Sequence, residues 1–168
     1  MPDISPLIIN GWNIYLHPLF VDQVDALKRK VQAQKQKDPQ RYQRKSAYKQ
    51  LQVIMRLAQH VIPQDPTLPE YRQGNTLGAE YKHWFRAKFF QQYRLFFRYH
   101  AESRIIVLAW VNDDSTKRAY ESERDAYRVF RKMLHSGHPP DDWDALLAEA
   151  MSEAGRVYGF PDVIHDGD

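Results

Sequence analysis

The chain has 168 residues, a formal net charge of +3 and an isoelectric point of about 9.0. Its hydrophobic fraction of 43% and aromatic fraction of 13% are globular, which excludes a chain that is disordered throughout. The absence of cysteine excludes disulfides and thiolate metal sites. No basic segment followed by an apolar run opens the chain, and no apolar run has membrane-spanning length, so we expect a cytoplasmic protein.

The N-terminal half is predicted to hold one strand and two helices. Residues 1–9 contain two prolines and are expected to form a flexible lead-in to a single domain over residues 10–154. Alternation of apolar and polar residues over 11–17 predicts a strand. Apolar residues at helical spacing predict a helix over 20–37 and a second one over about 40–61. Only a short break separates them, which favours an antiparallel helical hairpin.

The C-terminal half is predicted to hold three antiparallel strands and then two helices. A loop rich in Pro and Gly leads to a β-hairpin over residues 81–101. The next strand, 104–112, is almost continuously apolar, which indicates burial on both faces and a central place in the sheet. Helices are expected over 117–135 and 143–154, followed by a flexible tail over 155–168. This order predicts an α+β sandwich with its helices on one face of the sheet.

The predicted hairpin is rich in basic residues and has no acidic one. Its cations are Lys82, Arg86, Lys88, Arg94 and Arg98. With a period of two, Arg86 and Lys88 share a face of the first strand, and the opposite, apolar face builds the core. Rigid cations with aromatic residues between them suit a phosphate backbone with bases stacked beside it. The alternative is a solvated face whose arginines pair with carboxylates elsewhere in the chain.

The sequence offers little for metal-dependent or nucleotide-dependent chemistry. Two Asp-Asp pairs have ordinary roles at the ends of a strand and a helix, and His135 and His138 are a close pair without a third ligand. There is no Gly-rich phosphate loop. We therefore expect no metal and no cofactor. The remaining possibility is metal-free cleavage of RNA. In this reaction the 2′-OH attacks the adjacent phosphate, cations neutralise the phosphate charge, and a phenol, imidazole or lysine moves the protons.

Seven segments occur in the same order in a known family: Asn10–Pro18, Lys37–Lys45, Trp84–Phe89, Tyr93–Tyr99, Trp110–Asp113, Asp125–Leu134 and Gly137–Trp143. On these segments the chain resembles the YhaV-type toxins of bacterial type II toxin–antitoxin systems, within the wider RelE/ParE-like group. The resemblance implies a RelE-like α+β sandwich, with a small antiparallel or mixed sheet, an N-terminal helical hairpin and C-terminal helices. It also implies an endoribonuclease that inhibits translation and growth.

The resemblance further implies partners. The expected partner is a cognate antitoxin with an AbrB-like, swapped-hairpin domain, and the toxin would contact operator DNA only through the complex that represses their operon. The expected substrate is RNA, either free or as mRNA on the ribosome, and no membrane is involved. Two alternatives stay open. One is a non-catalytic module that binds nucleic acid or protein, and the other is a ParE-like toxin that poisons gyrase without cutting RNA.

The candidate catalytic residues lie in the hairpin and in the helix after the third strand. Arg86 stands in a Trp-x-Arg-x-Lys pattern and is expected to clamp the scissile phosphate, with Lys88 on the same face and Arg94 on the next strand. Arg124 and Tyr127 lie in a segment that resembles the terminal helix of RelE-like enzymes, although Tyr127 could instead be a core residue. The expected RNA-binding residues are Arg98, Lys82, Arg41, Arg44, Lys45, His135 and His138.

Overall fold

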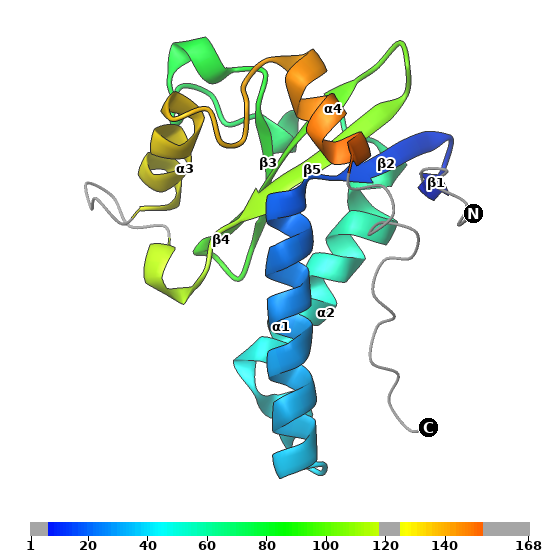
Figure 1. Ribbon diagram of the computed structural model, residues 1–168, viewed down its shortest axis with the longest axis vertical. Coiled ribbons are helices and arrows are strands. Elements are labelled where there is room, and N and C mark those ends of the chain that lie inside the picture. The colour runs from blue at the N-terminus through cyan, green and yellow to red at the C-terminus, as the bar shows by residue number, and fades with distance from the viewer. Residues whose placement is uncertain (1–6, 118–124, 153–168) are drawn as a thin grey trace.

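The computed structural model describes residues 7–117 and 125–152, which form a five-stranded mixed sheet with helices on both faces (Figure 1). The strands are β1 (Leu7–Ile9), β2 (Trp12–Leu16), β3 (Phe85–Phe89), β4 (Tyr93–His100) and β5 (Ile105–Val111). The α-helices are α1 (Pro18–Lys37), α2 (Ser46–Arg56), α3 (Ala126–His135) and α4 (Trp143–Ser152). The α+β class predicted from the sequence is therefore confirmed.

The strands lie in the order β1-β2-β5-β4-β3. Antiparallel pairing joins β3 to β4 and β4 to β5, as predicted, while β2 pairs in parallel with β5. β5 is central, and all of its residues after the first are buried, which confirms the reading of its apolar sequence. Leu7–Ile9 form the edge strand β1, where the sequence led us to expect an unstructured lead-in. A turn at Asn10 and Gly11, both with positive φ, folds β1 back onto β2.

Helices cover both faces of the sheet, so the expectation of helices on one face is wrong. One core lies under α1 and α2 and includes Phe20, Leu51, Leu95, Phe97 and Leu108. The other lies under α3 and α4 and includes Trp84, Phe96, Trp110, Phe130 and Leu146. The cause is the sequence of β5, which is apolar on both sides and would leave one apolar face in water if only one layer of helices were present.

The helices α1 and α2 form an arm that projects from the sheet (Figure 1). The twenty residues of α1 span about 30 Å at the usual rise of an α-helix. The second predicted helix is shorter than expected. Its first turn is a separate 3-10 turn, Tyr42–Arg44, and its end is a π-helical turn, Leu57–Val61.

The helix predicted over 117–135 begins only at Ala126. Asp114–Thr116 form a separate 3-10 turn, and residues 118–124 lie outside the described residues. The carboxylate of Asp125, which is buried, caps α3 by accepting a hydrogen bond from the backbone N–H of Tyr127 at 3.1 Å. The position of Tyr127 thus depends on this cap.

Replacing Asp125 with alanine is expected to lower the free energy of unfolding by about 0.5–2 kcal/mol, because α3 loses its N-cap. Asp142 caps α4 by accepting from the N–H of Ala145 at 2.9 Å, but it is exposed. Asp142→Ala is the matched control and should cost less, since water can replace its bond. Equilibrium denaturation of both variants measures the difference, and an equal loss in the two would contradict the prediction.

Candidate active site

Two arginines on neighbouring strands converge on one phenol oxygen. Nε of Arg86, on β3, donates to Oη of Tyr127 at 2.9 Å, and Nε of Arg94, on β4, donates to the same oxygen at 3.1 Å. Arg86 is 8% exposed, Arg94 7% and Tyr127 4%. The pairing of β3 with β4 and the packing of α3 over them bring these three residues together. Three of the predicted catalytic residues therefore form one cluster.

The guanidinium groups of this cluster are held by neutral acceptors. Nη1 of Arg86 donates to the carbonyl oxygen of Glu70 at 2.7 Å, and Nη1 of Arg94 donates to those of Gln91 and Tyr93 at 2.7 and 2.9 Å. Both ion pairs among the described residues involve histidine, so neither arginine is paired there with a carboxylate. Buried charge without a counter-charge is costly. The cluster therefore suits an anion.

Arg86 also lines an open pocket of about 500 Å³ along β3, the last strand of the sheet. The residues around it are Leu57, Val61, Pro69, Glu70, Tyr71, Arg72, Arg86, Ala87 and Lys88. Three of them are cations, and Lys88 and Arg72 are exposed. A β-bridge between Arg72 and Phe85 holds the 3-10 turn Pro69–Tyr71 against this edge. A phosphate in the pocket would meet positive charge from two separate segments of the chain.

Glu70 and Arg72 are not among the residues expected from the sequence. The carbonyl oxygen of Glu70 accepts a hydrogen bond from Arg86, and Glu70 also lines the pocket. Burial raises the pKa of Tyr71, and the negative charges of Glu70 and Asp65 raise it further. The segment 69–72 belongs to a loop without hydrophobic periodicity, and only its contacts with β3 reveal its place.

Arg98 lies on β4 but contacts the loop before α4. Its guanidinium lies over the rings of Trp84 and Trp143, at 5.5 and 5.2 Å from their centroids, and Nη1 donates to the carbonyl oxygen of Asp141. Burial lowers the pKa of Arg98, while the charges of Asp141 and Asp142 oppose this shift. Arg98 therefore fastens this loop to the sheet.

The histidines expected to bind RNA lie in different places. Nδ1 of His135, at the end of α3, lies 3.4 Å from Oη of Tyr81, next to the exposed Lys82. The ring of His138 instead packs edge-on against that of His17, with their centroids 6.0 Å apart. His135 and Lys82 therefore share one end of α3, whereas His138 contacts the N-terminus of α1.

The remaining predicted residues lie far from the cluster or outside the described residues. Arg41, Arg44 and Lys45 are exposed in the turn that joins α1 to α2, at the end of the arm away from the sheet (Figure 1). They cannot contact a phosphate that Arg86 holds. Arg124 falls in residues 118–124 and is outside the described residues.

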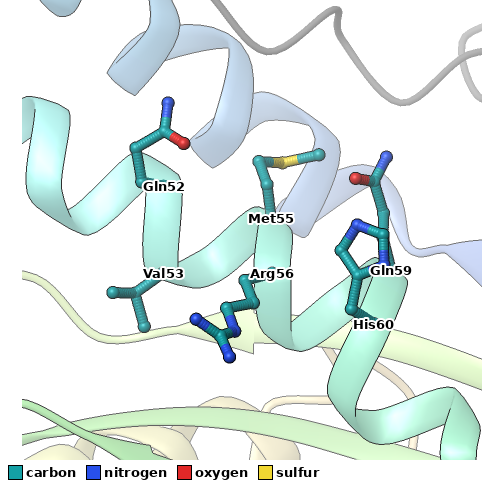
Figure 2. A pocket seen from close by; sticks show the side chains of 6 residues that line it. All are labelled: Gln52, Val53, Met55, Arg56, Gln59 and His60. Atoms are coloured by element: carbon teal, nitrogen blue, oxygen red, sulfur yellow. The ribbon is translucent and has the colours of Figure 1, made fainter.

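A second pocket, of about 620 Å³, lies along α2 and the π-helical turn that follows it (Figure 2). Figure 2 shows Gln52, Met55 and Gln59 on one side of this helix and Val53 and Arg56 on another. Arg56 is the one Arg or Lys side chain that lines this pocket, so the pocket is less cationic than the one at β3.

In the part of the chain that the structure describes, no three His, Asp or Glu side chains gather as metal ligands, and no helix has the length and apolar character to span a bilayer.

The fold and the site together define an α+β protein suited to a phosphate-bearing ligand. A family model described as a toxin with endonuclease activity, of a toxin–antitoxin system, matches residues 14–151. The chain therefore belongs to the YhaV toxin family, which confirms the resemblance seen in its seven segments.

Curated relatives are similar over nearly their whole length. Toxin YhaV of Escherichia coli O6:H1 is 47% identical over 146 residues, which are 86% of this chain and 95% of that protein. Ribonuclease toxin YhaV of Escherichia coli K12 is 46% identical over 146 residues, with the same coverage. No solved structure matches the chain significantly, so the RelE-like fold stays a prediction.

Proposed function

We propose that this toxin cleaves RNA by attack of the RNA's own 2′-OH on the adjacent phosphate, without a metal ion. The observation that carries the proposal is the pair of buried guanidinium groups of Arg86 and Arg94, which share the Tyr127 oxygen beside an open cationic pocket. The endonuclease activity of the family and the name of the ribonuclease relative support an RNA substrate.

In the proposed reaction, Arg86, Lys88 and Arg72 bind the scissile phosphate. Negative charge grows on the phosphate oxygens as O2′ approaches phosphorus, and donors that are already oriented stabilise it without reorganisation. Arg86 is oriented by its bonds to Tyr127 and to the Glu70 carbonyl, and its Nη2 has no hydrogen bond to any described residue. Tyr127 positions both arginines, and Arg94 supplies a second buried charge behind the pocket.

Two protons must move in this reaction. O2′ loses its proton as it bonds to phosphorus, and the 5′-oxygen gains one as its bond to phosphorus breaks, which gives a 2′,3′-cyclic phosphate and a 5′-OH. Glu70 is the carboxylate residue among those that line the pocket, and we assign it the role of proton acceptor. The Lys88 ammonium is the matching donor for the 5′-oxygen.

Cleavage of labelled RNA by the purified protein is expected to proceed in EDTA and to leave 2′,3′-cyclic phosphate ends. DNA and 2′-O-methyl RNA of the same sequence should stay intact, because neither has a free 2′-OH. If RNA is cut only when translating ribosomes are added, the ends formed there decide the chemistry. Fragments with 3′-OH ends, or cleavage that stops in EDTA, would contradict the mechanism.

Family membership also supports a cognate antitoxin as partner. We propose, from the resemblance, that this antitoxin has an AbrB-like, swapped-hairpin domain and that operator DNA is bound through the toxin–antitoxin complex. Copurification of the two proteins, followed by operator binding with and without the toxin, tests this. A toxin that binds the operator alone would contradict it.

A further inference from the structure

The exposed face of α3 carries a row of basic side chains. At positions i, i+3, i+4 and i+7 they line a hollow of about 320 Å³, and they are Arg128, Arg131, Lys132 and His135. All four are exposed, on the side of the helix opposite the buried Phe130 and Leu134. The helix contains no acidic residue. We call these four residues the α3 row.

Helix stability alone does not account for the α3 row. Cations in the last turn, here Lys132 and His135, interact favourably with the helix dipole. Arg128 lies in the first turn, where the dipole disfavours positive charge, and Arg131 is near the middle. Neither arginine has a carboxylate partner among the described residues, because the ion pairs there are His17–Glu149 and His83–Asp141. Both guanidinium groups are exposed, so they are accessible to a ligand in solution.

The α3 row runs along the helix that carries Tyr127 and ends beside the 3-10 turn Ala79–Tyr81, which precedes β3. It begins one residue after Tyr127, which holds Arg86 and Arg94. It ends about 10 Å further along the helix axis, at His135 beside Tyr81. Burial raises the pKa of Tyr81, the charges of Asp141 and Glu80 raise it further, and the charge of Arg131 lowers it, so this end of the row has both carboxylates and an arginine nearby.

We propose that the α3 row binds the sugar–phosphate backbone of the single-stranded RNA that flanks the cut phosphate. Guanidinium groups match phosphate oxygens in charge and geometry. A row that contacts only the backbone adds affinity without selecting a sequence. The inference deepens the proposed function, since it gives the substrate a second contact region outside the pocket at β3.

The test is equilibrium binding of a 2′-O-methyl oligoribonucleotide, which binds without being cut, at several salt concentrations. The variant is Arg128→Gln/Arg131→Gln/Lys132→Gln. The control, Lys28→Gln/Arg29→Gln/Lys30→Gln, removes the same charge from α1, on the opposite face of the sheet. Each phosphate contact on a single strand contributes about 0.7 to the slope of log K against log salt, so the α3 variant should lose about 2 and the control none.

An unchanged slope in the α3 variant, or equal losses in both variants, would overturn the proposal. So would an α3 variant that binds RNA normally but no longer binds the antitoxin, because the row would then be a protein-binding surface. Unfolding curves confirm that both variants are folded. The readout does not require cleavage, so cutting that proves metal-dependent would refute the proposed chemistry and leave the binding role of the α3 row standing.

Discussion

Replacing Arg86 with alanine is expected to slow RNA cleavage on the order of a hundredfold or more, because the site loses an oriented donor. Arg86 is the one residue that belongs both to the buried cluster at Tyr127 and to the open pocket. Its two hydrogen bonds, to Tyr127 and to the Glu70 carbonyl, fix the guanidinium before RNA arrives. Single-turnover cleavage of a labelled RNA measures the loss.

Two further substitutions separate this role from charge and from folding. Arg86→Lys keeps the positive charge but cannot make both hydrogen bonds. Its cleavage rate should therefore fall between that of the unaltered protein and that of Arg86→Ala. A ParE-like gyrase poison would tolerate Arg86→Lys and would cut no RNA. Arg104→Ala removes an exposed arginine that stacks on Trp12 of β2, and it should cut RNA normally. If Arg86→Ala cut RNA at the normal rate while folded, our assignment of the active site would be wrong.

Local sequence patterns predicted β3, β4 and β5, because alternation and apolar runs directly reflect burial on a sheet. The apolar run of β5 also indicates that helices cover both faces of the sheet. A strand that is apolar on both sides, such as β5, requires cover on both sides, which a single layer of helices cannot give. The strand β1 was missed although Asn10-Gly11 is a strong signal for a two-residue hairpin turn, because three residues are too few to show alternation.

The site was only partly predictable for a different reason. Arg86 and Lys88 stand in a basic strand pattern, and Tyr127 stands in a segment that resembles known enzymes, so all three could be found from the sequence. Glu70 reaches the pocket through the hydrogen bond of its carbonyl oxygen with Arg86, sixteen positions further along the chain. Arg72 reaches it through its β-bridge with Phe85. No periodicity encodes such contacts, and the sequence of a loop rich in Pro and Gly does not say which strand it will meet.

Replacing Glu70 with glutamine is expected to slow cleavage by about 10²–10⁴-fold, the usual contribution of a general base. The substitution leaves the backbone carbonyl of residue 70 in place, so the hydrogen bond that orients Arg86 is retained. It also removes a negative charge from a cationic pocket, so RNA should bind as tightly as before or more tightly. The cleavage rate is therefore expected to fall without any loss of binding affinity, which loss of structure would not produce.

Glu80 supplies the matched control, because it is also an exposed glutamate on a 3-10 turn, Ala79–Tyr81, but does not line the pocket. Glu80→Gln changes the net charge equally and should leave cleavage unchanged. Glu70→Asp keeps a carboxylate on a shorter side chain and should retain part of the rate. Saturating single-turnover cleavage and binding of 2′-O-methyl RNA separate the two effects. If Glu70→Gln cut RNA as fast as the unaltered protein, or faster, its carboxylate would only repel the substrate and the proton acceptor would lie elsewhere.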